Sequence, residues 1–338
     1  MYNGAGKGVL LVNCIIRREF AAQAMVRTYP PRPHHRNKRI VYEMTCPPEA
    51  THSGTLAFSR WRPTPLPETL VRDPGKPLFE LREDFFTYDP PQDGWIDWHL
   101  NFAHNDLFSF YDGPLFAQDE MQVAEHPGLA SLRHGLIASG VAPLAVENGL
   151  PTPALVMGVE RRCSIATEPN AAEGRPDGLY GNNFAAASAA AIRRATRLLE
   201  PPTRSNIIAM EAPAYGSGPY TREQIEFIWS TAYTGFAAAV QESRRMGGQE
   251  MQVAIHTGYW GCGAYGGNRV LMPLLQLIAA GCLDLDLLVF HAGPDSTGYR
   301  EAKQLLATLL PADEAVMTAE LLARITQLGF RWGIGDGT

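Results

Sequence analysis

The sequence predicts an α/β protein in which a mixed sheet lies between two layers of helices. From about residue 95, short apolar strand-like segments alternate with longer segments of helical periodicity. Strands separated by helices favour a largely parallel or mixed sheet covered on both faces. One of the strand-like segments also runs directly into a glycine-rich loop, and ligands in such sheets bind at the carboxyl ends of the strands.

Length and charge restrict the class of protein. The 338 residues are 45% hydrophobic, which allows one large core, or one core and a smaller accessory region. The net charge of −6 gives no general attraction to nucleic acid, so a phosphate-bearing ligand must be held locally. The five cysteines show no metal-ligand spacing and fit reduced thiols. We expect a cytoplasmic protein with no nucleic-acid or membrane partner; the oligomeric state stays open.

Residues 1–90 differ in composition from the rest and predict a Pro/Arg-rich accessory region before a domain at 91–338. Prolines are dense at residues 29–36 and 60–67, which argues against long helices and for an extended covering layer. Residues 9–13 and 39–43 are strand-like. The pair His34 and His35 lies in a basic stretch, which favours solvated surface over a metal site.

The second region gives its elements in order. Predicted strands are 95–103, 144–146, 154–158, 205–210, 252–255 and 285–290. Predicted helices are 118–126, 183–194, 221–245, 268–280, 302–310 and 318–328. Acidic residues in the first turn support the helix at 118, because they complement the positive end of the helix dipole. Thr221 is a suitable N-cap for the long amphipathic helix that follows it.

The loop after the strand at 252–255 is the most informative segment. Gly261, Gly263, Gly266 and Gly267 fall within seven positions, and aromatic residues lie among them. Glycine lets a backbone approach a ligand closely, and successive N–H groups form a nest for an anion beside a helix N-terminus. The segment predicts a cradle for a phosphate or diphosphate. The alternative is a glycine-rich connection without a ligand. The pattern is neither a dinucleotide fingerprint nor a P-loop.

Adjacent acids at the start of a predicted helix give a second candidate site. Asp119 and Glu120 follow the largely apolar loop at 108–117. Burial beside such a loop would raise the pKa of one carboxyl, which could then act as a general acid and afterwards as a base toward water. The alternative is that these acids only complement the helix dipole.

Together the two segments resemble poly(ADP-ribose) glycohydrolases, a family with a macrodomain-like fold. In that family a strand ending in Asp-Phe-Ala-Asn leads through a triple glycine to Gln-Glu-Glu, whose last glutamate is the catalytic acid/base. This chain has Asn101-Phe-Ala-His104 and then Gln118-Asp-Glu120. The family's Gly-Asn-Trp-Gly-Cys-Gly-Ala-Phe-Gly-Gly-Asp is similar to residues 258–268. Residues 207–213, 232–236 and 290–295 resemble further family segments, in the same order.

This chain departs from the family at the ribose-binding wall. Phe108-Ser-Phe110 replaces the triple glycine, Asn101 and His104 replace the Asp and Asn, and the tyrosine-rich segment that stacks on adenine has no clear counterpart. Side chains at 108–110 prevent the same close backbone approach. The acid and the diphosphate loop are kept, which suggests a changed substrate.

The resemblance implies a hydrolase of an N- or O-glycosidic bond to an ADP-ribose-type, NAD-derived group, acting on a small molecule or on an ADP-ribosylated target. It implies no cofactor and no metal; a metal site at His99, His104 and Asp106 is a weaker alternative. Catalysis is assigned to Glu120, with Asp119 tuning it. The substrate-binding residues predicted are Asn101, His104, Phe108, Phe110, Gln118, Trp260, Gly261, Cys262, Gly263, Ala264, Tyr265, Gly266, Gly267 and Phe290. The alternative function is a non-catalytic ADP-ribose reader; a dehydrogenase lacks its fingerprint loop.

Overall fold

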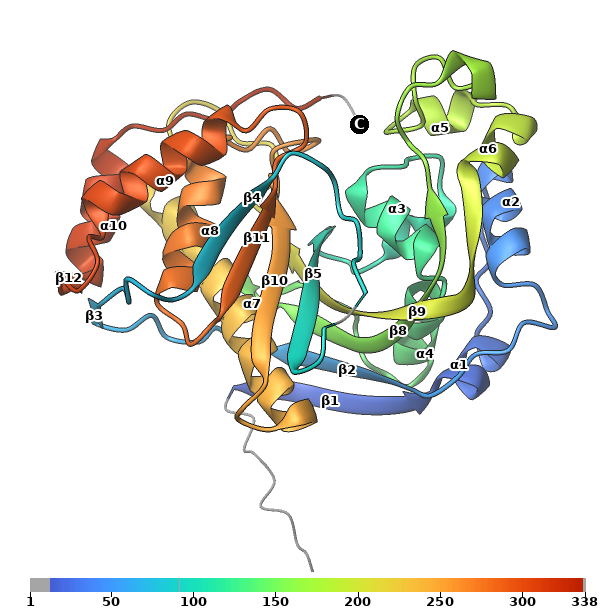
Figure 1. Cartoon of the computed structure of the whole chain (residues 1–338), viewed down its shortest axis with the longest axis horizontal. Coiled ribbons are helices and arrows are strands. Elements are labelled where there is room, and N and C mark those ends of the chain that lie inside the picture. The colour runs from blue at the N-terminus through green and yellow to red at the C-terminus, as the bar shows by residue number, and fades with distance from the viewer. Residues whose placement is uncertain (1–12, 91, 337–338) are drawn as a thin grey trace, which may run out of the picture.

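The structure is a computed structural model that describes residues 13–90 and 92–336 (Figure 1). Apart from Asn13, the strand-like segment at 9–13 lies outside the described residues. Within the described ranges, no helix is long and apolar enough to cross a bilayer.

An eight-stranded mixed sheet forms the centre of the protein, in the order β1-β2-β8-β9-β5-β10-β11-β4. Strands β9, β5, β10, β11 and β4 run parallel to one another. Strands β1, β2 and β8 complete the sheet by antiparallel pairing, with β8 antiparallel to β9. The bounds are β1 Cys14–Ala21, β2 Thr55–Trp61, β4 Leu78–Arg82, β5 Trp95–Ala103, β8 Ala154–Ile165, β9 Thr196–Glu211, β10 Gln252–Gly258 and β11 Leu287–His291. Short strands pair outside it: β3 Thr69–Leu70 with β12 Val316–Met317, and β6 Val146–Glu147 with β7 Leu150–Pro151.

Helices cover both faces of this sheet (Figure 1), which confirms the predicted three-layer α/β class. The helices are α1 Ala22–Thr28, α2 Arg36–Thr45, α3 Gln118–Glu125, α4 Gly128–Ala138, α5 Asn183–Ala186, α6 Ala189–Ala195, α7 Arg222–Gly247, α8 Leu271–Gly281, α9 Thr297–Leu309 and α10 Thr318–Gln327. Helices α7 and α8 pack on one face through a large apolar core, and α1 and α4 pack on the other face through a second core. Thr221 caps α7 as predicted, because its hydroxyl accepts a hydrogen bond from the N–H of Gln224 at 3.2 Å.

The prediction of an extended covering layer before residue 90 is wrong for the described residues. Strands β1, β2 and β4 belong to the central sheet. Residues 39–43, predicted as a strand, lie in helix α2. Its buried residues include Val41, Tyr42 and Thr45, a spacing that places them on one face of a helix. The prolines shape this region by bounding short elements, and they do not prevent the chain from entering the sheet.

Other elements differ from their predicted bounds. The helix predicted at 183–194 is divided into α5 and α6, and Ser188 between them accepts a hydrogen bond from the N–H of Ala191 to begin a new helix. The strands predicted at 154–158 and 205–210 extend much further, as β8 and β9.

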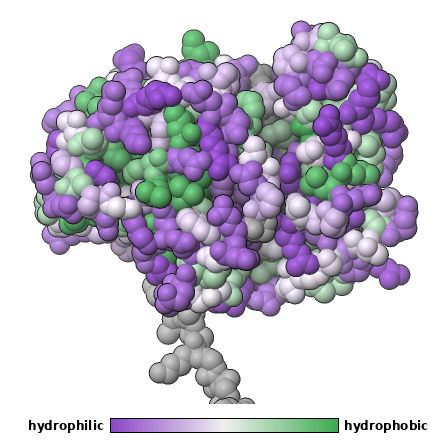
Figure 2. Space-filling view, in the orientation of Figure 1, coloured by the Kyte–Doolittle hydropathy of each residue, from purple (hydrophilic) through white to green (hydrophobic). Residues whose placement is uncertain are grey.

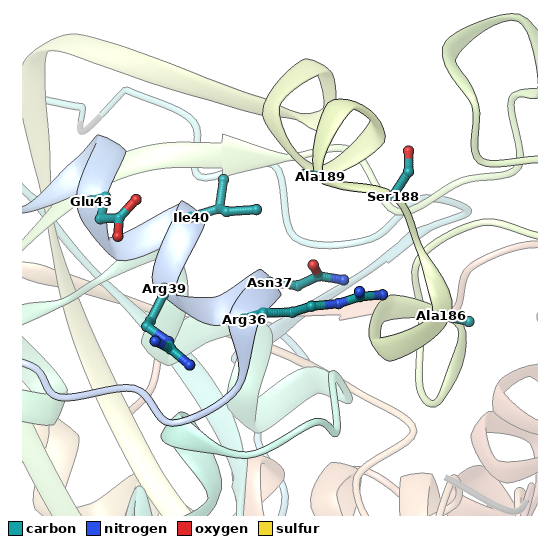
Figure 3. Close-up of a pocket in the computed structure, with 8 residues that line it drawn as sticks. All are labelled: Arg36, Asn37, Arg39, Ile40, Glu43, Ala186, Ser188 and Ala189. Atoms are coloured by element: carbon teal, nitrogen blue, oxygen red, sulfur yellow. The ribbon is translucent and has the colours of Figure 1, made fainter.

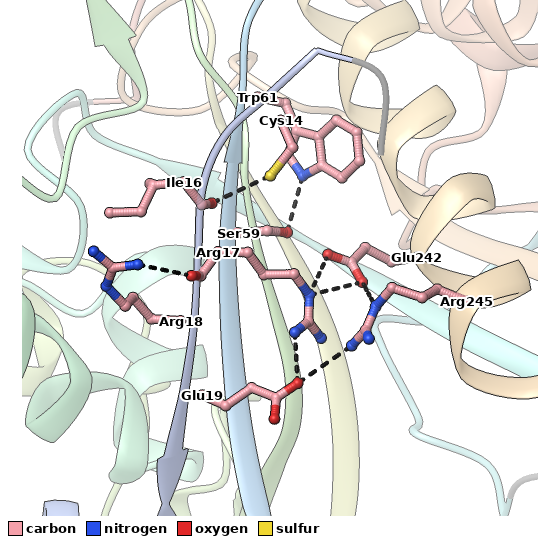
Figure 4. Close-up of polar contacts among 9 residues, drawn as sticks. All are labelled: Cys14, Ile16, Arg17, Arg18, Glu19, Ser59, Trp61, Glu242 and Arg245. Atoms are coloured by element: carbon pink, nitrogen blue, oxygen red, sulfur yellow. Dashed lines mark hydrogen bonds and ion pairs between the residues drawn. The ribbon is translucent and has the colours of Figure 1, made fainter. Parts of the chain in front are cut away.

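A buried ion-pair network fastens the first strand to α7 (Figure 4). The Glu242 carboxylate is fully buried and binds the Nε atoms of Arg17 and Arg245, each at 3.1 Å. The more exposed Glu19 binds Nη2 of Arg245 at 3.4 Å. Because Glu242 holds one cation on β1 and one on its own helix, it joins the edge of the sheet to the longest helix.

We expect Glu242→Ala to lower the free energy of unfolding by roughly 3 kcal/mol, because it removes the buried carboxylate and leaves the partly buried Arg17 paired only with the half-exposed Glu19. The matched control is Glu19→Ala, which removes a half-exposed carboxylate and should cost only about 0–1 kcal/mol. Urea titration measures both. Equal effects of the two variants would contradict this account of the network.

Candidate active site

Gln118 fixes the start of α3 against the sheet. Its side-chain oxygen accepts a hydrogen bond from the N–H of Phe102 at 2.8 Å, and its amide donates to the carbonyl of Leu100 at 3.0 Å. One side chain thus satisfies two backbone groups of β5, so the helix begins at a fixed place beside that strand. Gln118 therefore has a structural role at the start of α3, and its contact with a substrate stays a prediction.

Asp119 lies buried beside the end of β5. The amide of Asn101 donates to its Oδ1 at 3.0 Å. Burial and then the neighbouring charge of Glu120 raise the pKa of Asp119 to about 7, although hydrogen bonds from Asn101 and the backbone N–H of His104 oppose the shift. The side chain of Asn101 and the backbone N–H of His104 therefore both stabilise the ionised form of Asp119.

Glu120 is also buried and reaches back to the start of its own helix. Its Oε2 accepts a hydrogen bond from the N–H of Ala117 at 2.9 Å, as in one half of a capping box. Burial raises the pKa of Glu120, and the charge of Lys38 is the largest opposing effect. Two adjacent carboxyls with raised pKa values are suited to exchanging a proton near neutral pH.

The glycine loop after β10 has the backbone freedom that its sequence predicts. Gly261 and Gly266 have φ of +73° and +68°. A Cβ at Gly261 would lie 2.5 Å from the Cβ of Ala212, and one at Gly267 would lie 2.6 Å from the carbonyl oxygen of Gly261. Glycine is therefore required at these positions for the backbone to fold.

Several N–H groups of this loop point to no protein acceptor. Cys262, Gly266 and Gly267 donate hydrogen bonds within the loop or to its start. In the part of the chain that the structure describes, the N–H groups of residues 261 and 263–265 donate none. Helix α8 begins shortly afterwards, where Asn268 Oδ1 accepts from the N–H of Leu271 at 2.9 Å. This is the arrangement of an anion cradle.

Two tyrosines bring the loop and the carboxyl pair into one site. The Tyr180 hydroxyl lies 3.6 Å from the Cβ position of Gly263. Burial, followed by the charges of Asp336 and Glu120, raises the pKa of Tyr180 to about 12, while the N–H of Gln118 opposes the shift. Tyr265, in the loop itself, has a pKa raised by burial and by the carboxylates of Glu211, Asp119 and Glu120. The predicted loop and the predicted acids therefore face each other.

Glu211 is a third carboxyl of this site that the sequence analysis did not select. It ends β9, next to the end of β5. Burial raises the pKa of Glu211 to about 7, and a hydrogen bond from the N–H of Asn105 partly opposes this shift. The sequence does contain a signal for Glu211: it lies at the end of the strand-like segment within 207–213, and ligands in such sheets bind at the carboxyl ends of the strands.

The segment after α10 returns over the glycine loop. The N–H of Gly333 donates to the carbonyl of Gly266 at 2.8 Å, and the N–H of Asp336 donates to that of Gly263 at 3.4 Å. The Asp336 carboxylate oxygen lies 3.1 Å from the Cβ position of Gly263. Figure 2 shows a mainly hydrophilic face that is hollowed beside the projection carrying α5 and α6. Because of its distance from Gly263, the Asp336 carboxylate brings a negative charge of the protein itself to the predicted anion cradle.

Three aromatic residues predicted to bind substrate are instead part of the core. Trp260 is fully buried and its indole N–H donates to the carbonyl of Met210 at 3.1 Å. Phe290 is buried and stacks on Tyr299. Phe108 is buried, and its φ of +59° turns the chain at this point. Burial leaves these rings almost no exposed surface for direct contact with a ligand in this structure, because an apolar ring is stabilised by packing inward.

Phe110 and His104 remain at the surface near the carboxyl pair. Phe110 is 46% exposed, and its ring contacts that of His104 edge-on at 4.9 Å. Nδ1 of His104 accepts a hydrogen bond from the N–H of Asp106 at 3.1 Å. Burial raises the pKa of the Cys262 thiol to about 12, so this thiol stays protonated at neutral pH.

The alternative metal site is not assembled. His99 is buried between the rings of Tyr88 at 4.2 Å and His256 at 4.5 Å, whereas His104 lies beside Asp106. Among the described residues, no group of three or more histidine, cysteine, aspartate or glutamate side chains could hold a metal ion. His34, predicted as surface, is exposed and pairs with Asp112.

The structure is thus an α/β protein with a glycine-rich loop between a parallel strand, β10, and helix α8. Residues 178–297 match the family model of the poly(ADP-ribose) glycohydrolase catalytic domain, described as having the macro domain fold. The predicted family resemblance is confirmed over that segment, which includes the glycine loop. Glu120 lies outside it.

Solved poly(ADP-ribose) glycohydrolases are similar to this chain at low identity. The protein from Thermomonospora curvata is 15% identical over 86% of this chain and 85% of its own, with a TM-score of 0.39. The protein from Deinococcus radiodurans, solved in complex with ADP-ribose, is 12% identical over 87% of this chain and 95% of its own, with a TM-score of 0.37.

We expect Glu211 to make the protein less stable as pH rises from about 4.5 through 7. A carboxyl whose pKa is higher in the folded state binds its proton more tightly there, so stability falls as the unfolded chain ionises first. Between pH 5 and 8, Glu211→Gln should remove about 1 kcal/mol of this decline, allowing for partial exposure. Urea titration at both pH values measures it, with Glu19→Gln as control. An unchanged decline in Glu211→Gln would contradict the assignment.

Proposed function

We propose that this chain hydrolyses a glycosidic bond to an ADP-ribose-type group, with Glu120 as the general acid/base. The observation that carries this proposal is the meeting of two unlike features in one site: an anion cradle at residues 261–267 and a buried carboxyl pair at residues 119–120. The match of residues 178–297 to a glycohydrolase family supports the same reaction class. No cofactor is needed for it.

The diphosphate of such a substrate would lie on the N–H groups of residues 263–265, next to the start of α8. The N–H dipoles and the positive end of the helix both favour an anion. Asp119 and Glu211, whose pKa values are about 7, are largely neutral at slightly acidic pH, which limits their repulsion of phosphate. Tyr265, in the loop and close to the carboxyls, would pack on the ribose–phosphate region of the substrate.

In the first half of the proposed reaction, protonated Glu120 donates its proton to the leaving oxygen or nitrogen as the bond to the anomeric carbon breaks. The sugar passes through an oxocarbenium-like transition state. The resulting Glu120 carboxylate then takes a proton from the attacking water, and the hydroxide adds to the anomeric carbon. Glu120 regains its proton, so the cycle is balanced. Asp119, held by Asn101, tunes this exchange through its charge.

We infer further that the substrate is smaller than the polymer, either an NAD-derived molecule or a single ADP-ribose on a target protein. Support comes from two features that narrow the site: exposed Phe110 near the carboxyl pair, and the segment at 332–336 over the glycine loop. An apolar ring also offers contact to a leaving group other than ribose. Equal turnover of the polymer and of small conjugates would contradict this inference.

We expect Glu120→Gln to lower kcat about 10²–10⁴-fold on an ADP-ribosyl substrate while leaving the Kd for ADP-ribose nearly unchanged. The amide oxygen can still accept the hydrogen bond from Ala117, so the helix start is kept. The matched control, Asp119→Asn, should lose less activity because it alters only the charge near the acid. Steady-state kinetics and calorimetry measure the two quantities.

Full activity in Glu120→Gln would remove Glu120 from the mechanism. ADP-ribose binding without turnover in the unmodified protein would instead favour the reader module, the alternative function.

Gly263→Val is expected to abolish ADP-ribose binding without unfolding the protein. The nearest described groups to a Cβ at this position are side-chain ends, the Asp336 carboxylate at 3.1 Å and the Tyr180 hydroxyl at 3.6 Å, while the added side chain would block the cradle. Asp336→Asn should act in the opposite direction and tighten binding by roughly fivefold, because it removes a negative charge beside the diphosphate. Gly75→Val, in an exposed turn, is the control. Calorimetric binding to Gly263→Val equal to that of the unmodified protein would place the ligand elsewhere.

A further inference from the structure

Lys38 is a completely buried cation that the proposed mechanism does not yet use. It lies on α2, and its Nζ donates to the carbonyl of Tyr111 at 3.2 Å. The ammonium lies 5.1 Å from the ring centroid of Phe116 and 5.8 Å from that of Phe184, and these two rings stack at 4.0 Å. Both Tyr111 and Phe116 belong to the loop that leads into α3.

The ammonium of Lys38 has no direct carboxylate partner among the described residues. The carboxylates that act on Lys38 do so through their charge and not through a hydrogen bond to Nζ, and the bond to Tyr111 engages one N–H of three. Burying an ammonium that is only partly compensated costs several kcal/mol. Burial lowers the pKa of Lys38 to about 8, and the carboxylates that oppose this are Glu120, Asp119 and Asp112, in that order.

The other cations of α2 face the opposite way. Arg36 and Arg39 line an open cavity of about 660 Å³ between α2 and the α5–α6 segment, together with Asn37, Ile40, Glu43, Ala186, Ser188 and Ala189 (Figure 3). Both arginines are exposed. Because only the buried side of the helix faces α3, Lys38 is the α2 cation whose charge acts on the carboxyl pair.

We propose that Lys38 is a positioning residue for catalysis: its buried ammonium holds one carboxyl of the Asp119–Glu120 pair ionised while the other keeps the proton. This inference rests on the proposed function, in which Glu120 is the acid/base. Without a nearby cation, burial would favour the protonated form of both carboxyls, and Asp119 would then carry no charge with which to tune the proton exchange of Glu120.

Other groups face the pair from each element that packs against it. His104 after β5, Tyr180 before α5 and Tyr265 in the glycine loop act on the pair itself. Further out, Asp112 and His35 act on Lys38, Glu211 acts on Tyr265, and Asp336 acts on Tyr180. The anionic members of this set disfavour ionisation of the pair. Among its close neighbours, Lys38 has the largest effect lowering the pKa of Glu120, and for Asp119 it follows Asn101.

Lys38→Met tests this role, because methionine keeps the length and the apolar stem but removes the charge. The pH profile of kcat/KM should move to higher pH by about one unit, which corresponds to about tenfold lower activity at pH 6 and little loss above pH 8. The melting temperature should stay the same or rise, since a poorly compensated buried charge has been replaced by an apolar group. Arg39→Met, on the exposed side of the same helix, should leave the profile unchanged.

A second measurement is independent of turnover and of the folding of Lys38→Met. The NMR titration of the Lys38 side chain should shift to lower pH in Glu120→Gln, because that variant removes the carboxylate with the largest opposing effect on Lys38. A shift in this titration without any hydrolysis by the unmodified protein would overturn the proposed function and keep the coupling. An unmoved titration, or an unmoved pH profile with a lower melting temperature in Lys38→Met, would overturn the coupling and leave Lys38 a packing residue.

Discussion

The junction between the start of α3 and the end of β5 is the contact on which the candidate site depends. Gln118 binds two backbone groups of β5, and Asn101 on that strand binds Asp119. These hydrogen bonds compensate for the burial of polar groups that would otherwise face water. They also hold two carboxyls at a helix N-terminus in a place where burial raises their pKa values, which is the property that general acid/base chemistry requires.

Segments far apart in the sequence complete this junction. Lys38 comes from the first part of the chain, Tyr180 from the loop before α5, Tyr265 from the glycine loop, and Asp336 from the segment after α10. Each contributes a charge or a hydroxyl to the surroundings of the carboxyl pair or of the glycine loop. The site is therefore a property of the whole fold, and a change at one end of the chain can alter the proton balance at Glu120.

The sequence predicted the parts of the fold that have a local cause. The cap at Thr221, the acidic first turn of α3 and the run from β10 through the glycine loop to α8 follow from propensity, periodicity and turn chemistry, and all three are present. The candidate loop at 261–267 and the candidate pair at 119–120 can likewise be predicted from local features, namely the spacing of the glycines and two adjacent acids at a helix start. Residues 39–43 were assigned as a strand because a short apolar run reads as either element until its packing is known.

What the sequence did not predict depends on tertiary contacts. Nothing in the pattern of residues 1–90 shows that β1, β2 and β4 enter the sheet, or that Lys38 points into the site. Trp260 and Phe290 were assigned to the ligand because aromatic residues beside a functional loop suit stacking, yet both pack in the core. Whether such a ring faces in or out is decided by the space beneath it, which only the assembled structure defines.

A crystal structure of the complex with ADP-ribose tests the central claim most directly, since the account assigns one place to each end of the ligand. We expect the diphosphate oxygens within hydrogen-bond distance of the N–H groups of residues 263–265, the Asp336 carboxylate moved away from Gly263, and the terminal ribose facing the carboxyl of Glu120. A diphosphate bound away from the glycine loop, or a terminal ribose that does not face Glu120, would contradict the account.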